Sequence, residues 1–81
     1  MDLENILAKV PGAHVSAASR MLPAAVTETV DERTTEMMVP QLGMVRFFFK
    51  RMMSKKGKAR HHFWCAERAV VVAPEAAGGA S

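Results

Sequence analysis

The sequence predicts a small, mostly α fold that is completed by partner proteins. The chain has 81 residues, enough for one domain at most, and a chain of this size buries only about 60–65% of the surface that its unfolded form exposes. Apolar residues make up 49% of the chain, which is typical of folded rather than disordered proteins. Apolar side chains also recur at helical spacing in several segments. We therefore expect two or three short helices, an irregular basic segment and a C-terminal stretch that is open to an extended conformation.

The first half of the chain is expected to contain two of these helices. In Asp2–Val10, apolar residues recur at i, i+3, i+4 and i+7, and Pro11–Gly12 provides a stop signal. The segment Ala13–Leu22 is ambiguous. A second helix is predicted for Pro23–Met38, where acidic residues spaced four apart line one side: Glu28, Glu32 and Glu36. A facing basic surface would relieve the repulsion between these carboxylates.

A turn and a third helix are expected next. Proline and glycine both break regular structure, which places a turn at Val39–Gly43. In Gln41–Ser54, apolar residues fall within about half of a helical circumference, and basic residues occupy the opposite side. The turn would let this helix fold back along Pro23–Met38, with the acidic side of one helix near the basic side of the other.

The C-terminal third carries weaker signals. Ser54–His62 is polar and contains a glycine, so a loop is expected there. Phe63–Cys65 is a short apolar cluster. Ala69–Ala73 has the β-branched composition of a strand, but the sequence offers no clear partner strand. We expect residues 1–74 to form a single small domain or an extended accessory chain, and residues 75–81 to form a flexible tail.

Charge is distributed very unevenly along the chain. The formal charge is −3 over residues 1–40, +7 over residues 41–60, which contain no acid, and −1 over residues 61–81. Such a block presents one positive surface, so its cations are expected to bind an anionic partner. They are Arg46, Lys50, Arg51, Lys55, Lys56, Lys58 and Arg60. Three surfaces fit them: a nucleic-acid backbone, an anionic membrane face and an acidic protein surface, including this chain's own glutamates.

Apolar and aromatic residues lie beside this basic block and are expected to bind partner subunits. Methionine adapts to irregular apolar surfaces, and the chain contains seven methionines and four phenylalanines. The expected partner-binding residues are Leu42, Val45, Phe47, Phe48, Phe49, Met52, Met53 and Trp64.

These patterns favour a non-catalytic accessory or structural subunit of a larger intracellular multiprotein assembly, with membrane association as one form of it. Such a subunit would dock through apolar helix faces and the aromatic–basic segment 41–65. Two alternatives stay open. One is a nucleic-acid-contacting component of a ribonucleoprotein, and the other is a small regulator that inserts a helix into a groove. No sequence motif for reading specific bases is present, so contact with the backbone is the most that the nucleic-acid alternative predicts.

Catalytic and metal sites are not expected. Cys65 lies near two histidines, but so short a chain offers no pocket for a nucleophile, and a buried thiol beside Trp64 is predicted instead. His61, His62 and Cys65 lack the second ligand pair that zinc sites use. There is no phosphate-binding glycine loop or dinucleotide fingerprint, so no cofactor is expected.

The remaining signals concern location and modification. A single cysteine fits a reducing, intracellular compartment, and no secretory signal or membrane-spanning run is recognisable. Arg51 and Ser54 have the spacing of a basic-directed phosphorylation site. A phosphate on Ser54 would subtract nearly two charges from the basic block.

Overall fold

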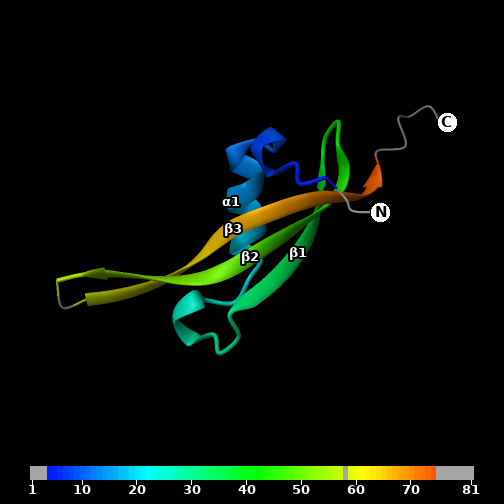
Figure 1. Cartoon of the computed structure of the whole chain (residues 1–81). Helices are drawn as coiled ribbons and strands as arrows, with labels where there is room; N and C mark the ends of the chain where they lie inside the picture. Colours follow the sequence, from blue (N-terminus) through cyan, green and yellow to red (C-terminus); the bar gives the residue numbers. More distant parts are fainter. Residues whose placement is uncertain (1–3, 58, 75–81) are drawn as a thin grey trace.

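The computed structural model describes residues 4–57 and 59–74, and it shows a three-stranded antiparallel sheet with one helix packed on it (Figure 1). The strands are β1 (Glu32–Val39), β2 (Gly43–Lys56) and β3 (Ala59–Pro74), in that spatial order. They are preceded by the 3-10 turn η1 (Leu7–Lys9), the helix α1 (Gly12–Arg20) and the 3-10 turn η2 (Ala25–Thr27). The fold is therefore mostly β, and the prediction of a mostly α fold is wrong.

The core lies between the sheet and α1. Every second residue of β2 from Val45 to Phe49 points to this side, because successive side chains of a strand alternate between its two faces. The Phe47 and Phe49 rings stack with their centres 6.2 Å apart. The buried core cluster consists of Ile6, Val10, Ala18, Val39, Val45, Phe47, Phe49 and Ala69. We call the opposite side of the sheet the open face.

The predicted turn at Val39–Gly43 is confirmed, but it joins two strands rather than two helices. The Leu42 amide donates a hydrogen bond to the Val39 carbonyl at 3.0 Å, which closes a β-turn around Pro40 and Gln41. Gln41 has a φ of 73°, which is the positive value that the third position of a type II turn requires. β1 and β2 then pair from Val39 opposite Gly43 to Glu32 opposite Lys50.

The helix predictions failed because residues that are four apart lie on the same side of a helix and also on the same side of a strand. Glu32 and Glu36 lie on one side in either structure, and so do Arg46 and Lys50. The segment predicted as a helix over Pro23–Met38 forms η2 and β1, and Gln41–Ser54 belongs to the turn and β2. In the Asp2–Val10 segment the described residues form only the turn η1, whereas α1 occupies the ambiguous segment Ala13–Leu22.

β3 accounts for most of the C-terminal third. The expected loop Ser54–His62 is strand except at the hairpin turn, and the strand character of Ala69–Ala73 is confirmed, with β2 as its partner. The segment before η1 lies against β3: the Ile6 amide donates to the Ala69 carbonyl at 2.7 Å, and Asn5 Oδ1 accepts the Ala69 amide at 3.0 Å. The tail predicted for residues 75–81 lies outside the described residues.

A side chain at Gly43 is expected to destabilise the hairpin of β1 and β2. It is buried between Val39 of β1 and Pro74 of β3, and its φ is 111°, a value that L-residues rarely adopt. Gly43→Ala should therefore lower the free energy of unfolding by about 1–3 kcal/mol, measured by urea denaturation. Gly12→Ala is the matched control, because a Cβ there meets nothing within 4 Å and φ is not positive. Equal losses in the two variants would contradict this account.

Candidate functional site

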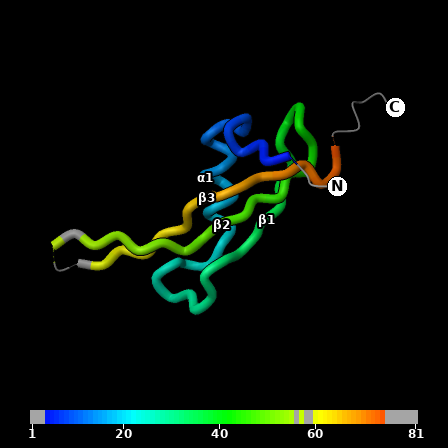
Figure 2. Tube along the Cα trace, in the orientation of Figure 1, coloured from blue at the N-terminus to red at the C-terminus, as the bar shows by residue number. Residues whose placement is uncertain are grey.

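A two-stranded arm extends beyond the body of the molecule. β1 ends its pairing at Lys50, whereas β2 and β3 continue together to Lys56 opposite Ala59. We call residues 51–56 and 59–64 the arm; Figure 2 shows it projecting to the left of the three-stranded region. Gly57, with a φ of 60°, is the first residue of the two-residue connection between its strands. The molecule is accordingly elongated, with extents of 55, 26 and 20 Å.

One side of the arm brings two cations face to face. Residues directly opposite each other in an antiparallel pair point to the same side, and Lys55 lies opposite Arg60. Like charges in such a pair repel each other unless an anion lies between or above them. Met53 and His62 form the next pair on this side. Both cations are exposed, and none of the ion pairs found among the described residues involves them.

The other side of the arm is apolar and continues the open face of the sheet. Met52 lies opposite Phe63, with 41% and 44% of their surfaces exposed. Ser54 and His61 form the adjacent pair toward the tip, and Lys50 and Cys65 form the adjacent pair toward the body. This side therefore combines an aromatic ring with flanking polar and cationic groups.

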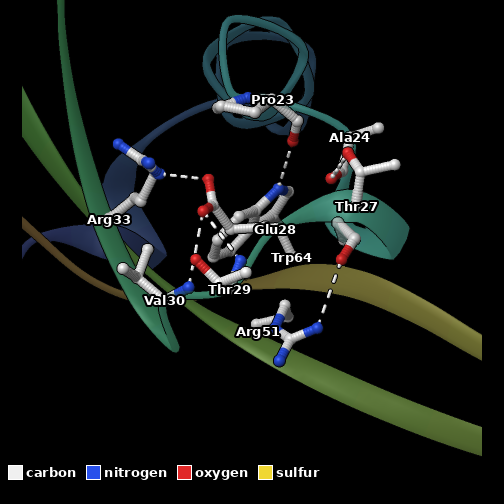
Figure 3. A network of polar contacts seen from close by, with 10 residues as sticks. Pro23, Ala24, Thr27, Glu28, Thr29, Val30, Arg33, Arg51 and Trp64 are labelled. Carbon is white, nitrogen blue, oxygen red and sulfur yellow. Dashed lines mark hydrogen bonds and ion pairs between the residues drawn. The ribbon is translucent and has the colours of Figure 1, made fainter.

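The base of the arm is fixed by the loop around η2. Trp64 Nε1 donates to the Pro23 carbonyl at 2.8 Å, and a guanidinium nitrogen of Arg51 donates to the Ala25 carbonyl at 3.4 Å (Figure 3). The Arg51 amide also donates to the Asp31 carbonyl at 2.7 Å, and its guanidinium lies 3.6 Å from the Asp31 carboxylate. Trp64 and Arg51 thus belong to the anchor of the arm.

Glu28 holds this loop together. Its carboxylate lies 2.5 Å from Arg33 Nε and accepts the amides of Thr29 and Val30 at 2.9 and 3.4 Å (Figure 3). The hydrogen bond from Arg33, followed by that from the Thr29 amide, lowers the pKa of Glu28 from 4.5 to about 2. The same contact raises the pKa of Arg33.

The lowered pKa of Glu28 predicts an acid-sensitive loop. A carboxylate with a depressed folded-state pKa contributes stability that is complete above a pH of about 4.5 and is lost as the pH falls toward about 2. Glu28→Gln should flatten the pH dependence of the free energy of unfolding in this window, measured by urea denaturation at successive pH values. Glu4→Gln, which removes an exposed ion pair with Lys9, should leave the dependence in place. An unchanged profile in Glu28→Gln would refute the assignment.

Charges on the body of the sheet are balanced, unlike those on the arm. Arg46 contacts Glu36 across the open face through two nitrogens, at 2.7 and 2.6 Å. Further along, Thr34, Phe48 and Arg68 form a row across the three strands, with the Arg68 guanidinium 5.2 Å from the centre of the Phe48 ring. A shallow hollow of about 700 Å³ opens over this row.

The structure separates the residues predicted to bind partners into two groups. Val45, Phe47 and Phe49 lie in the core, where they are packed under α1, and Leu42 and Trp64 are half-buried against that core. The remaining residues lie on the surface side of the strands: Phe48 and Met52 on the open face and Met53 on the other side of the arm.

The predicted anion-binding cations are also divided. Arg46 and Lys50 lie on the open face, Arg51 lies at the base of the arm, and Lys55 and Arg60 lie on the arm. Lys58 and the side chain of Lys56 lie outside the described part. Cys65 is exposed, so the prediction of a buried thiol is wrong: the strand register directs it to the open face beside Lys50.

Two residues of the surface were missed by the sequence analysis. Phe63 belongs to the predicted aromatic–basic segment but is not among the expected partner-binding residues, and Arg68 lies outside both predicted sets. The alternation of β3 would have identified both as neighbours of β2 residues on the open face, but only once β3 was recognised as one long strand.

The described residues contain no group of three His, Cys, Asp or Glu side chains arranged to hold a metal ion. Among them there is also no helix with the length and apolar character needed to cross a membrane. No protein-family model, curated protein or solved structure matches this chain.

Proposed function

We propose that this chain is a non-catalytic nucleic-acid-binding protein whose arm contacts the phosphate backbone. The observation that supports this most is the pairing of Lys55 directly opposite Arg60 on a projecting ribbon. The repulsion between these cations is relieved when a phosphate lies against them. On the body of the sheet, by contrast, Arg46 is already neutralised by Glu36.

The shape and composition of the arm support the same proposal. Lysine and arginine side chains release condensed counterions when they neutralise phosphates, which gives affinity without sequence preference. The sequence from Lys50 to Ala66, both included, contains six lysines or arginines, two histidines and no acid. A two-stranded ribbon is also narrow enough to follow a nucleic-acid groove or a single strand. The exposed thiol of Cys65 fits an intracellular, reducing location.

A salt titration tests the proposal. Fluorescence anisotropy with labelled single- and double-stranded oligonucleotides should show affinity falling steeply between about 50 and about 200 mM salt, with a log–log slope of about −2 to −4 for three to five phosphates contacted. Vesicles containing phosphatidylserine provide the comparison for an anionic membrane. Binding of the vesicles without binding of either oligonucleotide would overturn the proposal.

A second candidate function is that of an accessory subunit in a protein assembly. It is favoured by the apolar surface of the open face, where the exposed Met38 lies opposite Met44. Apolar docking holds or strengthens as salt rises, whereas phosphate contacts weaken. Co-purification of a defined protein partner that persists at high salt would favour this candidate over the first.

A further inference from the structure

We infer that the nucleic acid bound by this chain is single-stranded and that an unpaired base stacks on Phe63. This inference rests on the proposed function and identifies the class of ligand. The arm cations alone would serve either a duplex or a single strand, because both carry phosphates. The aromatic side chains of the open face distinguish the two, since bases inside a duplex are already stacked on each other.

Phe63 lies on the side of the arm that faces away from Lys55 and Arg60, so a single strand that contacts these cations reaches the ring by passing over the edge of the ribbon. Its ring has 44% of its surface exposed and lies on the open-face side of the arm, opposite Met52. One residue pair toward the body, Lys50 lies on this same side, and one pair toward the tip lies His61. An exposed aromatic ring on a ribbon that carries cations and no acid is an arrangement by which single-stranded nucleic acid is held without sequence preference.

A second aromatic ring, covered on one side by a guanidinium, lies on the open face in line with the first. Phe48 lies on the same side of β2 as Met52, four residues away, or about 13 Å along the strand. Arg68 lies over the Phe48 ring, and guanidinium planes also stack on bases. The hollow of about 700 Å³ over this row leaves room for a planar group. A strand running from the arm onto the body would therefore meet Phe63 first and this row next.

The distribution of charged side chains favours phosphate binding on the arm over phosphate binding on the body. Glu32, Glu36 and Glu67 lie on or beside the open face, and Glu36 already neutralises Arg46. Lys50 lies opposite Glu32, so phosphates are attracted to the acid-free arm instead, and the acidic residues of the body repel phosphates but not the uncharged base of an unpaired nucleotide. A rigid duplex cannot separate its bases from its phosphates in this way.

The test compares an oligothymidine with an abasic strand of the same length, at low salt, by fluorescence anisotropy. The wild-type chain should bind the oligothymidine about tenfold more tightly. Phe63→Leu, which keeps an apolar side chain beside Met52, should remove this difference and leave the affinity for the abasic strand unchanged. Met53→Leu is the matched control on the other side of the arm and should change neither affinity.

The outcomes separate this inference from the proposed function. If both strands bind equally and Phe63→Leu changes neither affinity, base stacking is wrong while backbone binding stands. Tighter binding of a duplex than of the oligothymidine leads to the same conclusion. If neither strand binds, both proposals are overturned. Thermal melting of each variant confirms that the compared proteins are equally folded.

Discussion

Phe47→Ala is expected to lower the free energy of unfolding by about 3–5 kcal/mol, a large part of the stability of a domain this small. Phe47 is fully buried, with 0% of its surface exposed, and it stacks on Phe49. Truncation removes a ring that projects from β2, the middle strand of the sheet, into the core beneath α1. The remaining side chains cannot collapse into the space, because the strands beside Phe47 are fixed by their hydrogen bonds. Urea denaturation followed by circular dichroism measures the effect.

The control for this substitution is Met21→Ala. Met21 follows α1 and has 59% of its surface exposed, so its truncation should change the free energy of unfolding by no more than about 0.5 kcal/mol. Similar losses in the two variants would mean that the sheet and α1 do not pack as described. The comparison also tests whether the chain forms its core without a partner, since a core completed only by another protein would show no cooperative transition in the isolated chain.

Lys55→Gln combined with Arg60→Gln is expected to weaken nucleic-acid binding by at least about tenfold. The slope of log affinity against log salt should become shallower by about 2, because each phosphate contact contributes about one unit. The free energy of unfolding should stay the same or rise slightly, because the substitutions remove a like-charge pair from the arm. Opposite effects on binding and stability distinguish a role in ligand binding from a structural one.

Lys9→Gln combined with Arg20→Gln provides the matched control. It removes the same number of charges from η1 and α1, away from the arm. If affinity depended only on net charge, both double variants would lose it equally, and the arm would have no special role. Retention of binding in the control and loss in the arm variant supports the site assignment.

The local breaks in the chain could be predicted from the sequence, whereas the class of its elements could not. Pro40 and Gly43 mark a turn in any fold, so their position was predicted correctly. β2 was misread because its outward residues include Met44 and Phe48 as well as cations, which hides the alternation of apolar and polar residues. The three consecutive phenylalanines of this segment favour a strand, but the apolar residues also fit helical spacing.

The basic segment could be found in the sequence, but its geometry could not. A block of cations without acids is visible in any fold, and two of its members form the cationic pair of the arm. The pairing of Lys55 with Arg60 depends on the register of β2 and β3, which the turn at Gly57 fixes. For the same reason the sequence could not separate Phe47 and Phe49, which build the core, from Phe48, which lies on the open face.

The early end of β1 has a consequence for the main chain of the arm. The Arg51 amide points toward the β1 side, where it reaches Asp31, so the alternation of an antiparallel strand directs the amides of Met53 and Lys55 to that side as well. No described strand lies there to accept them. Phosphate oxygens readily accept backbone amides, and these donors are present whatever side chains the arm carries. If the arm binds phosphates as proposed, neutralising its charged side chains would therefore leave some affinity that comes from the backbone amides.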